Sequence, residues 1–279
     1  MPGGIQSGEW MRLMKINPTR ALVATAALGL STAAASAADY VDLELVLAVD
    51  ISRSMDYDEL RLQRRGYVEA LTHPDVIQAI ESGPNGRIAV TYVEWAGTGH
   101  QSVVVPWAVL SNREEARAFA RRVGAAPIGR ERGTSISQGL GFAAKLFGAS
   151  GVTGLRRAID ISGDGPNNIG LPVVAMRDRL VADGITINGL PIMLKSVGGI
   201  GPFNIPDLDI YYEDCVIGGP GAFVIPVQDP SRFAMAIRRK LVLEIAGVGP
   251  RVMPVAAYSP APRADCLVGE KARSRWLRN

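Results

Sequence analysis

The chain alternates between two hydrophobic periods, which predict strands followed by helices. The segment 41–50 becomes almost wholly apolar toward its end, which is typical of a strand buried on both faces. Further strands are expected over 87–95, 101–107, 157–162, 185–192 and 222–227. Helical periodicity predicts helices over 58–71, 75–80, 112–123, 135–147, 172–183 and 231–245.

This alternation of strands and helices predicts the fold class. We expect an α/β fold with a doubly wound, mostly parallel central sheet and helices on both faces. The strands 87–95 and 101–107 are joined by the short connection Gly97-Thr98-Gly99, so they are expected to form an antiparallel pair at one edge. The last strand, 222–227, is expected to follow a turn that begins at Cys215. In such sheets ligands bind beyond the carboxyl ends of the strands.

Residues 1–37 are expected to be a signal peptide rather than part of the fold. Basic residues precede an apolar stretch of small residues over 21–35, and Ala35-Ser36-Ala37 is a cleavage signal. The alternative is a membrane anchor, but the apolar run is shorter than the ~20 residues that a spanning helix needs. The protein is therefore expected to be periplasmic or secreted in a bacterium. No later segment is long and apolar enough to cross a membrane.

The positive charge is concentrated at the two ends of the chain, whose formal net charge is +3. Residues 1–37 contribute three bases and one acid, and residues 250–279 contribute six bases and two acids, so residues 38–249 carry −3. This balance, without an aromatic-basic stripe, does not indicate a nucleic-acid partner. We expect one domain over 38–249 and a poorly ordered, basic tail rich in Pro and Ala over 250–279.

Oxygen-bearing side chains follow the predicted strands at one edge of the sheet. Asp50, Ser52 and Ser54 come just past the first strand, Thr134 precedes a helix, and Asp164 follows the strand 157–162. Carboxylate and hydroxyl oxygens without nitrogen or sulfur select Mg²⁺, with Mn²⁺ or Ca²⁺ as alternatives. Such a site leaves the ion short of negative charge, which a carboxylate of another molecule can supply. Taken singly, the same residues have ordinary interpretations, because Ser and Thr cap helices and Gly-Asp-Gly forms turns.

The segment Asp50-Ile-Ser52-Arg-Ser54, followed by Thr134 and by Ser162-Gly163-Asp164-Gly165, resembles the metal-ion-dependent adhesion site of von Willebrand factor A domains. The resemblance covers about residues 41–246. It implies that the two serines and the threonine can bind a metal ion and that the aspartates bind it directly or through water.

Further segments resemble a narrower family of exported bacterial proteins, domain of unknown function 1194, whose membership implies no biochemical activity. These segments are Tyr92-Val-Glu-Trp95, Ser162-Gly-Asp-Gly-Pro-Asn-Asn168, Ile185-Thr-Ile-Asn-Gly-Leu-Pro191 and Cys215-Val-Ile-Gly-Gly-Pro-Gly-Ala-Phe223.

Other residues are candidates for the surroundings of this site. Candidates for a partner-binding rim are Arg53, Glu94, Trp95 and Asn167. Related motifs often have Gly where this chain has Arg53, and a cation there lowers metal affinity and favours an anionic ligand. The two cysteines, Cys215 and Cys266, are candidates for a disulfide after export, and the alternative is two free thiols.

These features predict a binding module rather than an enzyme. The module would use its metal ion to bind a protein or peptide that presents an acidic side chain. The alternative is a Mg²⁺-dependent hydrolase acting on a phosphate or ester, but such an enzyme needs a positioned base or a second metal. The chain has no G-x-S-x-G motif of a serine hydrolase, and its histidines, His73 and His100, are expected at the surface.

Overall fold

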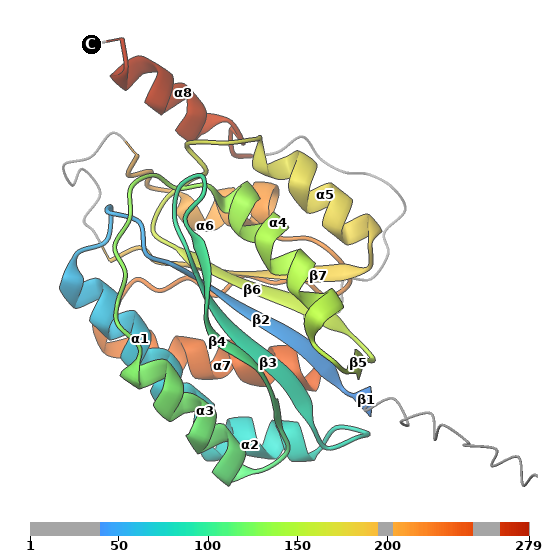
Figure 1. Cartoon of the computed structure of the whole chain (residues 1–279). Coiled ribbons are helices and arrows are strands. Elements are labelled where there is room, and N and C mark those ends of the chain that lie inside the picture. Colours follow the sequence, from blue (N-terminus) through green and yellow to red (C-terminus); the bar gives the residue numbers. More distant parts are fainter. Residues whose placement is uncertain (1–39, 195–202, 248–262, 279) are drawn as a thin grey trace, which may run out of the picture. The chain divides into compact units, whose positions relative to one another are not determined.

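A five-stranded sheet forms the centre of the structure, with the strand order β4-β3-β2-β6-β7. The structure is a computed structural model that describes residues 40–194, 203–247 and 263–278 (Figure 1). The strands are β2 (Leu43–Asp50), β3 (Ile88–Trp95), β4 (Gln101–Leu110), β6 (Arg157–Gly163) and β7 (Ile185–Pro191). Strand β4 is antiparallel to β3 and the other pairs are parallel, so the predicted fold class and antiparallel pair are confirmed.

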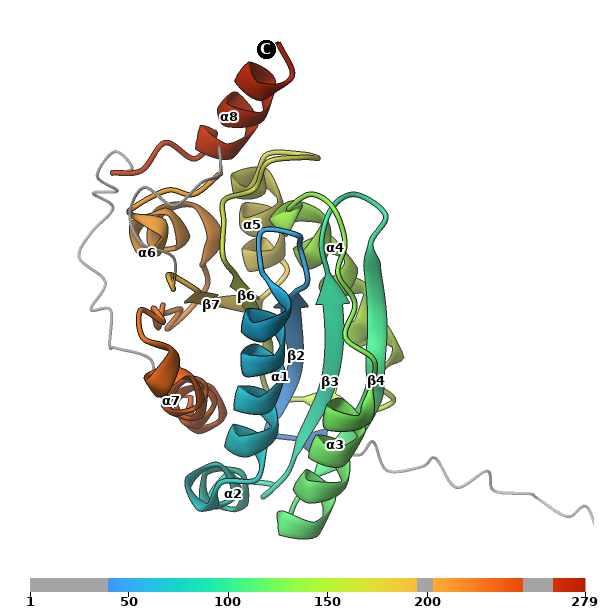
Figure 2. The ribbon, with the colours of Figure 1, turned by 90° about the vertical axis from the view of Figure 1, so that its left-hand side faces the viewer.

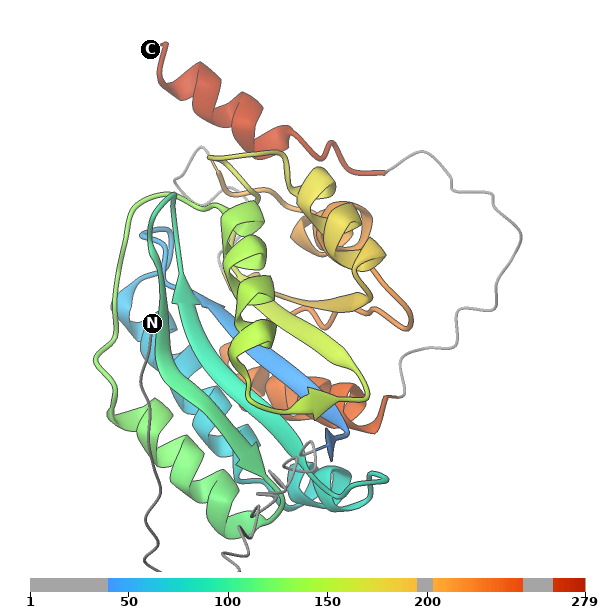
Figure 3. The same cartoon turned by 45° about the vertical axis from the view of Figure 1, so that its right-hand side comes forward.

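Helices cover both faces of this sheet. The α-helices of the described residues are α1 (Tyr57–Leu71), α2 (Pro74–Glu81), α3 (Arg113–Ala125), α4 (Ile136–Leu146), α5 (Val173–Ala182), α6 (Leu208–Tyr211), α7 (Phe233–Ala246) and α8 (Val268–Trp276), of which α8 lies beyond the carboxyl edge of the sheet. Figures 1 and 2 show α1, α2, α3 and α7 on one face, and Figure 3 shows α4 and α5 on the other.

The central strand β2 supplies both layers of the core because its side chains alternate between the two faces. Leu45 and Leu47 pack in a buried cluster with residues of α1, α3 and α7. Val46 and Ala48 pack in a second cluster with residues of α4 and α5. The apolar run in the sequence therefore reflects a strand with helices on both sides, and it places Asp50 at the carboxyl end of the sheet.

Segment 222–227 is not the strand that its composition predicts. It pairs with β7 and with Ile192, the residue after it, through isolated bridges at Val224 and Val227. The amides of Gly189 and Met193 donate to Phe223 and Val227, but Pro191, between them, has no backbone N–H to donate, which interrupts a regular ladder. At the opposite edge of the sheet, β4 contains the exposed Pro106, and its pairing with β3 has irregular register around Tyr92.

Two helical segments contradict the expectations for the C-terminal half of the chain. Cys215 lies in a helical turn, Tyr212–Val216, that continues α6, rather than in a turn leading into a strand. The tail was expected to be poorly ordered, but α8 lies within it and belongs to the same compact unit as the sheet. The structure contains the candidate disulfide between Cys215 and Cys266 rather than two free thiols, and this bond ties the start of α8 to the same unit.

The expected signal peptide, 1–37, and residues 250–262 of the tail lie outside the described residues. Within the described part of the chain, no helix combines the length and the apolar character needed to span a membrane.

A charged cluster is buried between the sheet and α7. Lys240 Nζ lies 2.6 Å from both Asp160 Oδ1 and Glu244 Oε1, and all three side chains are inaccessible to solvent. Asn188 Nδ2 donates to Glu244 Oε1 at 2.9 Å. Two carboxyl groups share one ammonium group, so burial and the neighbouring charge of Asp160 raise the pKa of Glu244 to about 7, against the opposing effect of Lys240.

The raised pKa of Glu244 predicts a pH-dependent effect of Glu244→Gln. Between about pH 4.5 and pH 7 the folded protein keeps a proton on Glu244 that the unfolded chain has lost, so this group costs stability as the pH rises. A glutamine can still accept from Lys240 and Asn188 without this cost. We expect the variant to match the wild type near pH 5 and to exceed its unfolding free energy at pH 8 by about 1–3 kcal/mol. Urea unfolding at both pH values measures the difference in unfolding free energy between the variant and the wild type. A variant that is less stable than the wild type at pH 8 would contradict this expectation.

Candidate metal-binding site

Three loops meet at the carboxyl edge of the sheet, which is the upper edge in Figure 2. They follow β2, precede α4 and follow β6. The amide of Glu131 donates to the carbonyl of Ile51 at 2.8 Å, which joins the first two loops. The amide of Thr134 donates to Asn168 Oδ1 at 3.0 Å, and the amide of Asn168 donates to the carbonyl of Thr134 at 2.9 Å, which joins the second loop to the third.

Four of the predicted ligand residues form one chain of short contacts. The amide of Ser52 donates to Asp50 Oδ1 at 2.7 Å, and the hydroxyls of Ser52 and Ser54 lie 2.7 Å apart. Ser54 Oγ donates to Asp164 Oδ1 at 2.5 Å, which links the loop after β2 to the loop after β6. The fifth, Thr134, is buried and is joined to this cluster through the backbone bonds of Asn168.

None of Ser52, Ser54 and Thr134 caps a helix with its side chain. Helix α1 begins after Asp56, whose carboxylate accepts from the amides of Asp58 and Glu59 in a capping box. Helix α4 begins after Ser135 and has no side-chain cap. The hydroxyl groups of the candidate site are therefore not explained by helix capping.

Asp50 is wholly buried, and its environment opposes ionisation. Burial, followed by the charge of Asp164, raises the pKa of Asp50 to about 8, although hydrogen bonds from Ser52 act in the other direction. Among the described residues, Asp50 Oδ2 and the hydroxyl of Tyr212 are buried atoms with no hydrogen-bond partner. Burial, together with the charge of Asp50, raises the pKa of Tyr212 well above its usual value.

Gly163 allows these two groups to approach the end of β6. A Cβ atom at this position would lie 2.9 Å from Asp50 Oδ2 and 2.9 Å from the hydroxyl of Tyr212. The side chain of Gln63 fixes the same region, because its Nε2 donates to the carbonyl of Asp50 at 3.0 Å and its Oε1 accepts from Ser162 Oγ at 3.0 Å. The backbone around Asp50 is therefore held from both β6 and α1.

The candidate rim residues divide into exposed and buried ones. Arg53 is exposed, and its carbonyl accepts from Arg130 Nη2 at 3.0 Å. Glu94 is 5% exposed and forms an ion pair with Arg64, and burial raises the pKa of Glu94 although Arg64 opposes this. Trp95 is fully buried in the core. The expectation of a rim position is therefore wrong for Glu94 and Trp95. Their side chains point to opposite faces of β3, and helices cover both faces, with α1 on the side of Glu94 and α4 on the side of Trp95.

Asn167 is also fully buried rather than on the rim. Its Oδ1 accepts from the amide of Ser137 at 3.1 Å, and its Nδ2 donates to the carbonyl of Leu171 and to Glu270 Oε1. The contact with Glu270 comes from α8, which the sequence analysis had assigned to a poorly ordered tail. Asn167 thus holds the loop after β6 in place from three sides.

The pair His100–Glu131 at this edge was not singled out from the sequence. Glu131 forms a bridge with Ser52, and its Oε2 lies 3.6 Å from His100 Nδ1, with both side chains about half exposed. The sequence could have indicated this position, because His100 lies in the hairpin that follows the carboxyl end of β3. In the part of the chain that the structure describes, no three His, Cys, Asp or Glu side chains gather to hold a metal, so hydroxyl groups must complete any site here.

The solved structures that resemble this chain include a von Willebrand factor type A protein, a matrix protein and a pilus adhesin. The chain is similar to a von Willebrand factor type A protein from Catenulispora acidiphila at 18% identity, with a TM-score of 0.50, over 74% of this chain and 43% of that one. It is similar to proximal thread matrix protein 1 from the mussel byssus at 16% identity, with a TM-score of 0.54, over 75% and 49% of the chains. The pilus adhesin SpaC from Lactobacillus rhamnosus GG matches at 13% identity, with a TM-score of 0.56, over 74% and 31%.

These similarities, at low identity, define the fold as that of a von Willebrand factor A domain, and the chain spans less than half of each of those proteins. The family model described as protein of unknown function DUF1194 matches residues 40–249, so the chain belongs to this family. The resemblance to von Willebrand factor A domains is confirmed for the fold, and the expected membership of the narrower family is confirmed by its family model. A comparison with curated protein sequences gives no match.

The close approach at Gly163 predicts that Gly163→Ala destabilises the fold. The added methyl group would overlap Asp50 and Tyr212, and overpacking of this kind costs about 1–3 kcal/mol. Gly148→Ala is the matched control, because a Cβ atom there meets no heavy atom within 4 Å. Urea unfolding compares the two variants. Equal losses of unfolding free energy would show that Gly163 is not needed for Asp50 and Tyr212 to lie close to the end of β6.

Proposed function

We propose that this chain is an exported, metal-dependent protein-binding module. Asp50, Ser52, Ser54, Thr134 and Asp164 bind one divalent cation, directly or through water. Mg²⁺ is the proposed ion, with Mn²⁺ or Ca²⁺ as alternatives, because the donors are hard oxygens. The ion's remaining coordination position takes an acidic side chain from a protein or peptide partner.

The observation that carries this proposal is the buried carboxyl group of Asp50. The groups that lower its pKa are hydrogen-bond donors of Ser52 and Asp164, whereas burial and the charge of Asp164 raise it. A carboxylate that is buried beside a second one is costly unless a cation is present. Asp50 Oδ2, without a hydrogen-bond partner among the described residues, fits a group that completes its coordination with a metal ion.

Similar proteins support the class of function. One of them is described as a pilus adhesin, and one structure of the mussel matrix protein, similar at 16% identity with a TM-score of 0.50, is described as having a zinc-occupied MIDAS motif. Adhesins and matrix proteins act outside the cell, which agrees with the signal peptide expected over 1–37. These likenesses motivate the proposal of a binding role without turnover.

Metal binding is expected to stabilise the folded protein. At a free-ion concentration about 100 times Kd, binding adds about 2.7 kcal/mol to the unfolding free energy, which raises Tm by several degrees. We expect Mg²⁺ or Mn²⁺ to raise the Tm of the wild type and a chelator to reverse the shift. Asp50→Asn and Asp164→Asn should lose the shift. In chelator above pH 8, where the carboxyl group of Asp50 is ionised, Asp50→Asn should unfold no earlier than the wild type because it removes a buried charge.

The matched control is Asp58→Asn, which makes the same change of charge on an exposed side chain paired with Arg61. It should keep the full cation-dependent shift. If the wild type shows no shift with any of the three cations, or if Asp50→Asn keeps it, the metal has no part in the function.

Partner binding is expected to require both the ion and a carboxylate. Full-length protein on a resin should retain envelope proteins in Mg²⁺ and release them in chelator, and Asp164→Asn should retain none while Asp58→Asn retains them. Release by an excess of an Asp-containing peptide, but not by its Asn counterpart, identifies the acidic group. If the resin retains the same proteins with and without chelator, the proposal is contradicted.

A screen of phosphoesters and carboxyl esters tests the hydrolase alternative on the same protein. The base available to such an enzyme is His100 beside Glu131. Cation-dependent turnover that disappears in both Asp50→Asn and His100→Ala would replace the binding module with a hydrolase.

A further inference from the structure

The C-terminal helix α8 lies directly against the loop that carries Asp164. Its inner face is made by Gly269 and Ala272, one turn apart, and both are buried. A Cβ atom at Gly269 would lie 2.1 Å from the carbonyl oxygen of Asn167 and 3.1 Å from Pro166. Glycine at this position therefore permits contact between the helix and the backbone of the loop.

A polar contact accompanies this packing. Glu270 Oε1 accepts a hydrogen bond from Asn167 Nδ2 at 2.7 Å. The other bonds of Asn167 reach Ser137 of α4 and Leu171 of its own loop, so this side chain joins α8 to the body of the domain. Asn167 is three residues from Asp164, and the next residue, Asn168, holds the backbone of Thr134.

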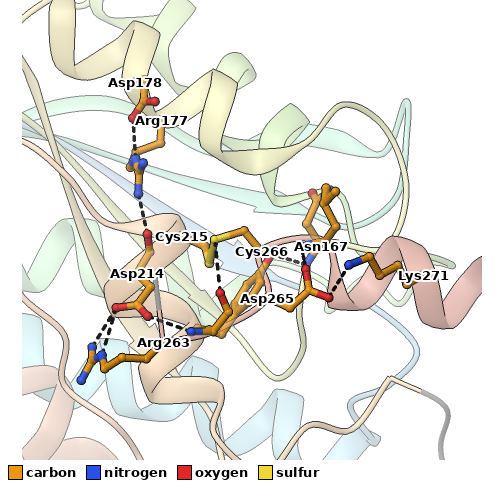
Figure 4. Close-up of a disulfide and its surroundings, with 12 residues drawn as sticks. Asn167, Arg177, Asp178, Asp214, Cys215, Arg263, Asp265, Cys266 and Lys271 are labelled. Carbon is orange, nitrogen blue, oxygen red and sulfur yellow. Dashed lines mark hydrogen bonds and ion pairs between the residues drawn. A yellow bond between two sulfur atoms is a disulfide. The ribbon is translucent and has the colours of Figure 1, made fainter. Parts of the chain in front are cut away.

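The start of α8 is tethered to the helical turn Tyr212–Val216, as Figure 4 shows. The tether is the disulfide between Cys215 and Cys266. Arg263 adds ion pairs with Glu213 at 2.6 Å and Asp214 at 2.8 Å. Because the Arg263 side chain is largely exposed, these ion pairs contribute little, and the disulfide is the main link.

Helix α6, which this helical turn continues, also contacts the loop. The hydroxyl of Tyr211 accepts from the amide of Asn167 at 3.1 Å. The loop after β6 is thus held between Tyr211, on α6, and Glu270, on α8, and the disulfide joins the turn that follows α6 to the segment that precedes α8.

We propose that α8 is a positioning element for the candidate metal site, with Glu270 as the positioning residue and the disulfide Cys215–Cys266 as its anchor. This inference rests on the proposed function. Helix α8 donates no ligand. It orders the loop that presents Asp164 and fastens Thr134, so that the loop is already in place when the ion binds. Residues that orient metal ligands from outside typically contribute a factor of about 10–100 in metal affinity.

Titration of full-length, oxidised protein with Mn²⁺, followed by the EPR signal of the free ion, tests this role. We expect Glu270→Ala and the double variant Cys215→Ser/Cys266→Ser to bind Mn²⁺ about tenfold more weakly than the wild type. Glu270→Gln should bind within about twofold of the wild type, because the glutamine oxygen can still accept from Asn167. Arg275→Ala, on the exposed side of the same helix, is the control and should bind as the wild type does.

Amide hydrogen exchange of the metal-free proteins gives a second readout. Exchange in residues 164–168 should be faster in Glu270→Ala and in the double cysteine variant, and should return to the wild-type rate in Glu270→Gln. Wild-type affinity and wild-type exchange in the first two variants would overturn the role of α8 and leave the proposed function standing. If the wild type binds no Mn²⁺, the proposed function fails, and the inference fails with it.

Discussion

The carboxyl groups of Asp50 and Asp164 set the requirements for the loops around them. Strand β2 is buried along its whole length, so the carboxyl group of Asp50 at its end lies in a dry environment that opposes its ionisation. Serine hydroxyls, backbone amides and the space left by Gly163 accommodate this residue. The edge of the sheet is therefore less stable than it would be with uncharged side chains, which is common where a protein keeps a site for binding.

The fold contains a second buried carboxyl pair, and the comparison is informative. Asp160 and Glu244 lie beside Lys240, whose ammonium group opposes the rise in both pKa values. Lys240 therefore balances the charge of one of these two carboxyl groups from within the chain. For Asp50 the opposing influences are dipoles of hydroxyl and amide groups. One cluster carries its own counter-ion, whereas the other is suited to one that arrives from solution.

Much of the sheet and the convergence of the loops could be predicted from the sequence. The apolar run before Asp50 identifies the central strand, and the topology rule for parallel strands brings Thr134 and Asp164 to the same edge. Whether a single side chain is exposed or buried could not be predicted, since Glu94 and Trp95 would end the same strand whether they lay on the rim or in the core. Nor could α8, because its contact with Asn167 joins residues 103 positions apart. At segment 222–227 the regular ladder is lost because Pro191 of β7 has no amide to donate, which the hydrophobic composition of the segment itself does not reveal.

Both lateral edges of the sheet are poorly suited to pairing with another chain. On one side, β4 has an exposed proline and irregular register, and on the other, segment 222–227 covers β7 through isolated bridges. Free strand edges invite intermolecular β-pairing and aggregation, and prolines and bulges suppress both. A protein that must remain soluble at high local concentration benefits from such protection. Edges of this kind are also poor acceptors for an added strand of another protein.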